Sequence, residues 1–131
     1  MHISATVRNK QAHHEVAVAT DDSVKTLTVP PRSTGFGSGV NGGEFLMLAL
    51  ATCYCNDLYR EASRLRISLE SVEVEASADF AGVGLAATNI CYKAKVVSAS
   101  PDADIERLLR ETDAVAEIHN TLRAGAPVLR V

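Results

Sequence analysis

The first thirty residues contain three stretches in which apolar positions alternate with polar or small ones. These stretches cover residues 3–8, 14–19 and 24–29, and two prolines end the third. Alternation with a period of two is typical of strands that bury one face. We therefore expect three short strands, the first two forming a hairpin through residues 9–13.

A long helix is expected from about Asn41 to about Arg66. Asn41 and Glu44 have the spacing of a capping box, in which two side chains bond backbone N–H groups at a helix start. The following segment, FLMLALATCYC, is apolar on nearly every face. A helix of this kind is normally covered by protein on all sides.

The second half of this helix is amphipathic. Leu58, Ala62 and Leu65 recur at helical spacing and form one apolar stripe. The charged residues between them, Glu61 included, are expected to face away from the core.

Further elements follow in the second half of the chain. Residues 70–80 alternate strictly and predict a strand with one wet face, with residues 89–98 as its antiparallel partner. A second helix is expected from Pro101 to Gly125, and residues 128–131 are expected to form a last strand. The order βββ-α-ββ-α-β favours an α+β fold, which we interpret as one domain over residues 1–131.

Composition excludes several classes of function. The 131 residues carry a formal charge of −3, which argues against nucleic-acid binding. The longest apolar run, residues 45–55, is too short for a membrane span, which needs about 20 residues. Three cysteines and no apolar signal segment predict reduced thiols in a cytoplasm. The glycines of residues 35–43 match no phosphate-binding loop, so no nucleotide cofactor is expected.

Cys53 is the main candidate for chemistry, with two interpretations. Free cysteine is commonly a small core residue. A reactive thiol instead needs a nearby cation or a helix N-terminus to favour its thiolate. Cys53 lies twelve residues beyond Asn41, so the helix terminus contributes little there. An activated Cys53 therefore needs a cation from elsewhere, and Arg32 is the best candidate, whereas Arg60 is expected to be solvated.

The other candidate ligands and nucleophiles are interpreted as structural. Cys53 and Cys55 point about 200° apart on a helix and cannot clamp one metal ion. Cys55 is expected in the core and Cys91 within a strand. His119 is expected to be a hydrogen-bonded core histidine. No metal site is predicted.

The segment from Asn41 to Cys53 resembles the OsmC/Ohr family, whose hallmark is an Asn-Pro-Glu motif followed by a small-residue helix that reaches Ala-Ala-Cys. Asn120-Thr121-Leu122 resembles the end of that family's Cys-Pro-x-Ser-Asn-x-Leu motif. The resemblance implies an α+β fold in which antiparallel sheets wrap around two central helices. It also implies an intertwined homodimer with active sites at the dimer interface.

The resemblance further implies reduction of organic hydroperoxides during the oxidative stress response. In active members one Cys attacks the peroxide, a second Cys forms a disulfide, an Arg stabilises the thiolate and a Glu orients that Arg. Here Cys53 matches the attacking Cys, and Arg32 falls within about one residue of the Arg. Gly43 occupies the Glu position and Glu44 follows it, while Ala116 replaces the second Cys.

Two functional hypotheses follow from this pattern. In the first, Cys53 is the centre of a one-thiol peroxidase that an external thiol reduces, with Arg32 and Glu44 as its catalytic partners. In the second, the chain is a noncatalytic paralogue that binds a small apolar ligand at the dimer interface. Neither hypothesis involves nucleic acid or a membrane.

Overall fold

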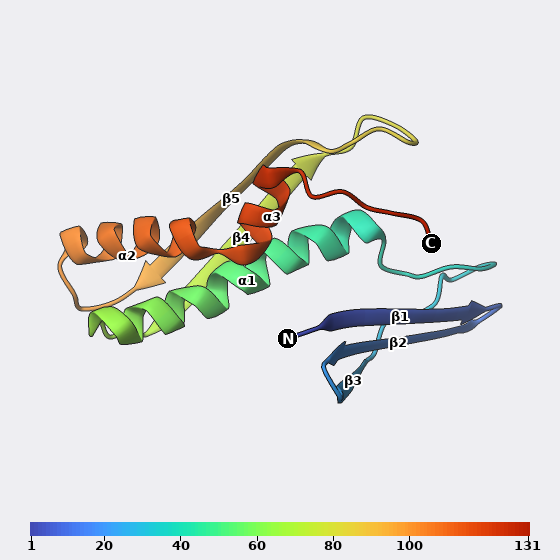
Figure 1. The fold of residues 1–131 in the computed structure, drawn as a ribbon, viewed down its shortest axis with the longest axis horizontal. Helices are drawn as coiled ribbons and strands as arrows, with labels where there is room; N and C mark the ends of the chain where they lie inside the picture. Colours follow the sequence, from blue (N-terminus) through green and yellow to red (C-terminus); the bar gives the residue numbers. More distant parts are fainter. The chain divides into compact units, whose positions relative to one another are not determined.

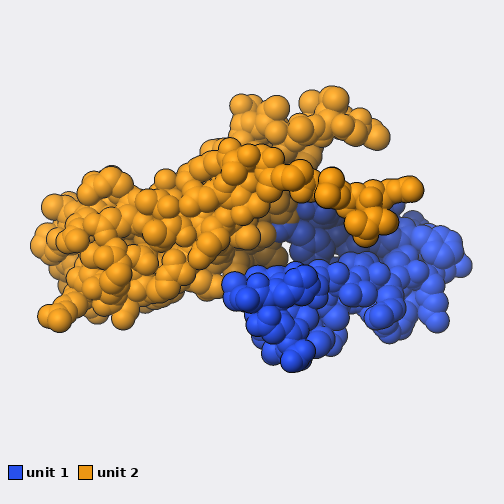
Figure 2. Space-filling model, in the orientation of Figure 1, with its two compact units in different colours: residues 1–45 blue, residues 46–131 orange.

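The computed structural model describes residues 1–131. These residues divide into two compact units, Met1–Phe45 and Leu46–Val131 (Figure 2). Each unit has its own secondary structure and is considered separately. The expectation of a single domain over the whole chain stays a prediction.

The first unit is a three-stranded antiparallel sheet. Its strands are β1 (Ile3–Lys10), β2 (His13–Thr20) and β3 (Ser23–Leu27), in the spatial order β1-β2-β3 (Figure 1). Ala12 adopts a positive φ of 58° in the two-residue connection between β1 and β2, a backbone geometry suited to tight hairpins. The three predicted strands and the first hairpin are confirmed.

Helix α1 (Gly42–Leu65) begins at the predicted capping box. The Asn41 amide donates to Glu44 Oε2 at 2.7 Å, and the Glu44 amide donates to Asn41 Oδ1 at 2.9 Å. At the other end Arg66 has a φ of 58°, and the amide of Ile67 donates to the carbonyl of Ala62 at 2.8 Å. These are features of a Schellman C-cap, so both ends of the helix satisfy backbone groups locally.

The second unit contains the hairpin of β4 (Ser71–Asp79) and β5 (Thr88–Val97). Its alternation follows the prediction: Val72 and Val74 pack towards the helices, whereas Glu73 and Glu75 are exposed. The expected wet face of this sheet is therefore confirmed.

The C-terminal helix is interrupted, contrary to the sequence prediction. Helix α2 (Asp102–Val115) and helix α3 (Glu117–Ala124) meet at Ala116, whose ψ of 103° is extended. The Asn120 side chain donates to the Ala114 carbonyl at 3.1 Å, so it satisfies backbone left unpaired by the break. The predicted last strand is also wrong, because residues 128–131 have no regular structure.

The core of the second unit lies between α1, α2 and the β4–β5 hairpin (Figure 1). Its buried members are Tyr54, Leu58, Ala62, Leu108 and Ala116. The apolar stripe predicted for the second half of α1 is thus confirmed.

Two expectations about α1 are not met. Glu61 is only 7% exposed instead of facing solvent, because Arg60 and Arg64 both pair with its carboxylate. The apolar first half is not fully covered by the chain alone, since Leu48 is 58% exposed.

Candidate functional site

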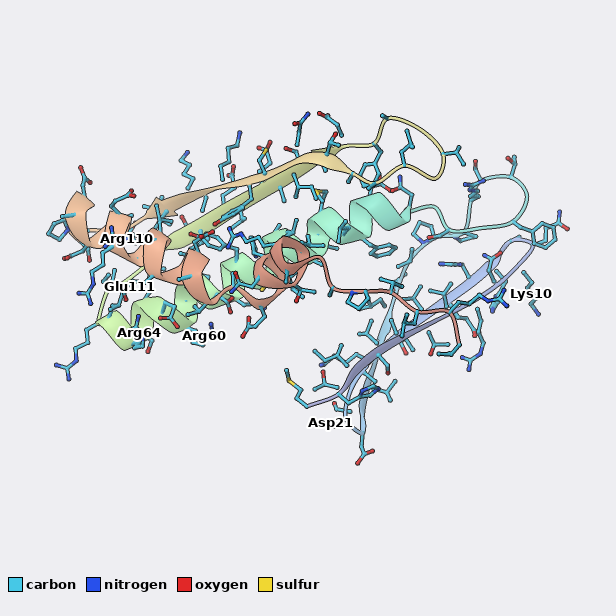
Figure 3. All side chains as sticks on the ribbon, turned by 45° about the horizontal axis from the view of Figure 1, so that its top comes forward. Lys10, Asp21, Arg60, Arg64, Arg110 and Glu111 are labelled. Carbon is cyan, nitrogen blue, oxygen red and sulfur yellow. The ribbon has the colours of Figure 1, made fainter.

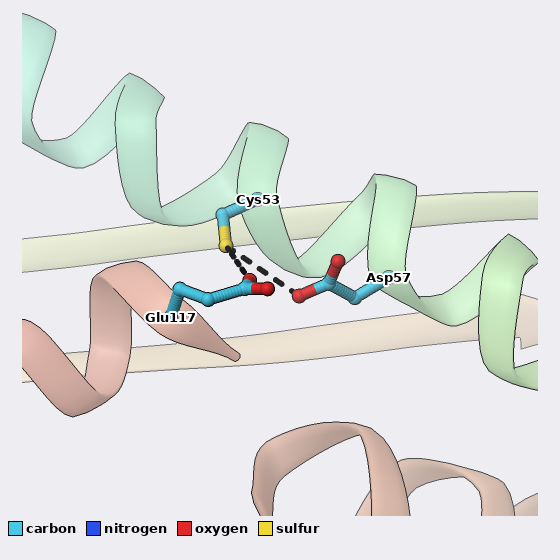
Figure 4. Close-up of side chains that lie close together, drawn as sticks. All are labelled: Cys53, Asp57 and Glu117. Carbon is cyan, nitrogen blue, oxygen red and sulfur yellow. Dashed lines mark hydrogen bonds between the residues drawn. The ribbon is translucent and has the colours of Figure 1, made fainter. Parts of the chain in front are cut away.

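Cys53 lies beside two carboxylates (Figure 4). Its Sγ is 3.5 Å from Oδ2 of Asp57, one turn further along α1, and 3.9 Å from Oε2 of Glu117, the first residue of α3. The thiol is the donor in both contacts. The break between α2 and α3 therefore places an acidic residue against the candidate nucleophile.

This environment favours the protonated thiol. Burial is the largest cause that raises the pKa of Cys53, and the negative charges of Asp57 and Glu117 raise it further. The backbone N–H of Ile118 acts in the opposite direction and does not offset them. Because the thiolate is the nucleophilic form, this arrangement lowers the intrinsic reactivity of Cys53 near neutral pH.

Arg60 pairs with the two carboxylates that contact Cys53. Its Nη1 lies 2.8 Å from Asp57 Oδ1 and 3.9 Å from Glu117 Oε1. Burial raises the pKa of Asp57 while the Arg60 charge lowers it. Arg60 was expected to be a solvated surface group; it is half-exposed and neutralises the acids next to Cys53.

Further ion pairs continue from this cluster along α1. Arg64 bridges Glu61, at 2.6 Å, and Glu111 of α2, at 2.5 Å. Figure 3 shows Arg60 and Arg64 on α1 and Glu111 on α2. These pairs tie α1 to α2 at the end of the helix away from the capping box.

The donor atoms of Cys53, Asp57 and Glu117 lie within 4.8 Å of one another, a spacing that a metal ion could bridge. The Arg60 guanidinium already supplies a positive charge to both carboxylates. The negative charge of the two carboxylates is therefore partly balanced by Arg60 without a metal ion.

Arg32 and Glu44 belong to the first unit, whereas Cys53 belongs to the second. The Arg32 amide donates to the Gly37 carbonyl at 3.0 Å, and Glu44 is engaged in the capping box. Their catalytic roles stay predictions.

The remaining cysteines do not form a disulfide. All three cysteines are free, with Cys55 partly buried outside the main core and Cys91 exposed on β5. Ala116, which the resemblance aligns with the family's second Cys, is completely buried. The expectation of Cys55 as a core residue is met only in part.

A cavity of about 380 Å³ lies elsewhere in the second unit, between α1, β5 and α3. Its apolar wall consists of Leu50, Ile90 and Leu122. Leu50 is buried, while Ile90 is 42% exposed. The volume falls within the range of about 300–1,000 Å³ that is usual for small-molecule sites.

His119 lines this cavity and is only 4% exposed. The expectation of a hydrogen-bonded histidine is wrong, because neither ring nitrogen has a hydrogen-bond partner. Its ring packs against those of Tyr92, at a centroid distance of 4.5 Å, and Tyr54, at 5.6 Å. Burial lowers the pKa of His119, and Arg123 lowers it further, so the imidazole is neutral near neutral pH.

Sequence reasoning missed Asp57 and Glu117 as neighbours of Cys53. One signal was available for Asp57, because residues four apart share a helix face. For Glu117 the signal was its place directly after the position of the family's second Cys. His119 was identified as inward-facing, but its unpaired nitrogens had no sequence signal.

Solved structures share this fold. An organic hydroperoxide resistance protein OsmC from Legionella pneumophila is similar, with a TM-score of 0.63, 18% identity and coverage of 94% of this chain and 90% of that chain. An OsmC-like protein from Mycoplasma pneumoniae has a TM-score of 0.62 and 20% identity, and the match covers 93% of this chain and 86% of that chain. A third similar structure is a putative organic hydroperoxide resistance protein from Vibrio cholerae with captopril bound in one of the active sites. Its TM-score is 0.61 and its identity 18%, and the match covers 94% of this chain and 85% of that chain.

These likenesses define an α+β protein of the OsmC-like fold. The family model described as OsmC-like protein matches residues 35–129, so the chain belongs to this family, as the sequence motifs predicted. A search of curated proteins gave no significant match. No helix has the length and apolar character needed to cross a bilayer.

Proposed function

We propose that this OsmC-like protein binds a small, largely apolar ligand in the cavity between α1, β5 and α3. The observation that carries the proposal is the cavity itself, with Leu50, Ile90 and Leu122 forming its apolar wall. Apolar walls with a few polar groups are characteristic of small-molecule sites. The Vibrio cholerae structure with captopril in an active site supports small-molecule binding by this fold.

The environment of Cys53 favours a binding function over a peroxidase. A peroxidatic thiolate needs a cation against its sulfur. Cys53 instead donates hydrogen bonds to two carboxylates, and Arg60 pairs with those carboxylates. The electrostatics therefore oppose formation of the thiolate.

The binding function is tested with ethylbenzene and 2-phenylethanol, two compact probes with apolar bodies. Titration of each into isotopically labelled protein should shift amide resonances of residues that line the cavity, Leu122 among them. Leu122→Trp, which fills the cavity, should abolish the shifts. Thr121→Trp, on an exposed position of the same helix, should leave them unchanged. Absence of saturable binding by both probes would refute the proposal.

A second candidate is a one-thiol organic hydroperoxide reductase. The observation in its favour is the Asp57 carboxylate, which lies 3.5 Å from the Cys53 sulfur and can accept the thiol proton. The sulfur would attack the terminal peroxide oxygen, the O–O bond would break, and an alcohol and a Cys53 sulfenic acid would form. Two equivalents of an external thiol would return the sulfenic acid to the thiol, releasing water and a disulfide of that reductant.

In this candidate Arg32 would stabilise the thiolate and Glu44 would orient Arg32. The reduced protein is treated with an alkyl hydroperoxide and a dimedone-type probe for sulfenic acid, with Cys53→Ser as the control. Rapid labelling that depends on Cys53 would support the reductase. Labelling no faster than that of an unfolded thiol is the result we expect.

We further propose that the protein is a cytoplasmic homodimer. Several large apolar side chains of the second unit are more than half exposed in the single chain, among them Leu48 at 58%, Phe80 at 53% and Leu85 at 61%. Extensive exposed apolar surface commonly marks an interface. Light scattering coupled to size-exclusion chromatography should give twice the mass of the 13.9 kDa chain. A monomeric mass at micromolar concentration would contradict the dimer.

A further inference from the structure

The cavity contains one polar side chain without a partner. Four of its lining residues carry polar groups: Cys91, Tyr92, His119 and Arg123. Three of these are already engaged by other protein groups, whereas both nitrogens of His119 are not. The difference shows which group is available to a ligand.

The engaged groups have well-defined partners. The Tyr92 hydroxyl donates to the Asp113 carboxylate. Arg123 Nη2 donates to the same carboxylate at 2.7 Å, and its Nη1 donates to Asn120 at 3.2 Å. Cys91 Sγ lies 3.2 Å from the Ser77 hydroxyl. The charge of Arg123 is therefore balanced within the protein.

His119 differs because its ring nitrogens are shielded from water by burial and have no protein hydrogen-bond partner in its place. Buried polar groups almost always have a partner, and an unpaired one is costly. The imidazole ring is part of the cavity wall. The χ2 torsion of histidine is broad, and we expect the ring to rotate on ligand binding so that a nitrogen faces the cavity.

We propose that His119 selects an uncharged ligand with an apolar body and one hydrogen-bonding head, such as a hydroxyl. This inference rests on the proposed binding function and specifies the chemical class of its ligand. The apolar body lies against Leu50, Ile90 and Leu122, and the head bonds an imidazole nitrogen. A neutral imidazole offers one donor and one acceptor, which a hydroxyl matches.

An anionic head is disfavoured at this site. The Asp113 carboxylate accepts hydrogen bonds from Arg123 and Tyr92, two residues that line the cavity. Because Arg123 is already paired with Asp113, a carboxylate on the ligand would have no unpaired cation among the residues that line the cavity. The ligand class is therefore an alcohol-like molecule and not an acid.

Three probes with closely similar bodies test the selection: 2-phenylethanol, ethylbenzene, which lacks the hydroxyl, and phenylacetate, which is charged. We expect 2-phenylethanol to bind about three- to tenfold more tightly than ethylbenzene, the ratio given by one net hydrogen bond. Phenylacetate should bind more weakly than 2-phenylethanol. His119→Phe, which keeps an aromatic ring, should reduce the preference of alcohol over ethylbenzene to about one.

A spectroscopic measurement on the unmodified protein keeps the test independent of the variant's folding. The ¹⁵N resonances of the His119 ring should move on addition of 2-phenylethanol and stay in place with ethylbenzene. The rings of the other three histidines serve as internal controls.

The outcomes separate the two levels of the proposal. If neither ethylbenzene nor 2-phenylethanol binds, the binding function itself fails. If both bind equally, or if phenylacetate binds best, the cavity is a ligand site but the selection by His119 is wrong. Unchanged His119 ring resonances in the alcohol complex would also overturn the selection.

Discussion

The thiol of Cys53 donates a hydrogen bond to the carboxylate of Asp57, one helical turn away on α1. The two groups affect each other in opposite ways: burial and the Asp57 charge raise the pKa of Cys53, whereas burial raises the pKa of Asp57 and the hydrogen bond from Cys53 lowers it. Groups with shifted pKa values often occur at functional sites. In this protein the pair maintains Cys53 in its unreactive form.

Replacing the Asp57 carboxylate should therefore activate the sulfur. Asp57→Asn removes the nearest negative charge and frees Arg60 to approach the thiolate, so the pKa of Cys53 should fall. We expect the rate of Cys53 alkylation by iodoacetamide at neutral pH to rise about three- to tenfold, since one pKa unit changes the thiolate fraction about tenfold. Peptide mass mapping measures the rate at each cysteine.

Cys55 and Cys91 provide internal controls for this prediction, since neither is bonded to Asp57. Glu117→Gln is a matched variant that should give a smaller increase, because Glu117 is 69% exposed and its contact is longer. A Cys53 alkylation rate that is unchanged or lower in Asp57→Asn would contradict the electrostatic interpretation.

The buried Glu61 carboxylate should contribute to stability in a pH-dependent way. The hydrogen bond from Arg64, followed by that from Arg60, lowers the pKa of Glu61 below its ordinary value of 4.5. A carboxyl with a lowered folded-state pKa stabilises the protein above the unfolded-state value, and this contribution is lost as pH falls through the folded-state pKa. Stability should therefore decline below about pH 4.5 partly through Glu61.

Glu61→Gln tests this contribution by urea unfolding at about pH 7 and about pH 3.5. The variant should be less stable than the unmodified protein at the higher pH and closer to it at the lower pH. Glu70→Gln, an exposed glutamate with no resolved ion pair, is the matched control and should behave like the unmodified protein. A constant difference between Glu61→Gln and the unmodified protein at both pH values would show that Glu61 acts through packing alone.

The strands and α1 could be predicted from sequence because their signals are local. Alternating Val72 and Val74, the capping box at Asn41 and Glu44, and Gly125 with its left-handed φ of 63° each act over a few residues. The pairing of Glu61 with two arginines depends on tertiary packing. Hydrophobic patterning alone therefore placed this carboxylate in solvent.

Hydrophobic periodicity does not reveal the break at Ala116, because apolar residues continue across it at helical spacing. No glycine or proline marks the position. The family resemblance did contain a signal: its motif has Pro where this chain has Glu117, the first residue of α3, and Pro favours the first position of a helix. The contacts of Glu117 with Cys53 depend on this break and could not be derived from the pattern.

The capping box should account for a measurable part of the stability of α1. Asn41→Ala removes the acceptor for the Glu44 amide and should lower the free energy of unfolding by about 1 kcal/mol. Glu44→Gln retains most of the reciprocal bond and should cost less. Chemical denaturation of the three proteins measures the difference, and equal stability of Asn41→Ala and the unmodified protein would show that the cap contributes nothing.

His119 should make the protein less stable in mildly acidic solution. Burial, and secondarily the Arg123 charge, lowers its folded-state pKa below the ordinary value of 6.5, although Asp113 and Asp57 oppose this shift. Below about pH 6.5 the unfolded chain binds a proton that the folded chain does not, so stability falls with pH until the folded-state pKa is reached. The loss amounts to about 1.4 kcal/mol for each pKa unit of difference.

His119→Phe removes this titration and the two unpaired nitrogens, while the ring contacts with Tyr54 and Tyr92 can be kept. Its free energy of unfolding should exceed that of the unmodified protein by up to about 1 kcal/mol near pH 8, because a buried unsatisfied polar group is removed. The advantage should grow as the pH is lowered from about 7 to about 5.5. His14→Phe, which alters a histidine in the first unit, should show no such growth. If the two stability curves of His119→Phe and the unmodified protein run parallel between these pH values, the buried imidazole does not titrate differently on folding.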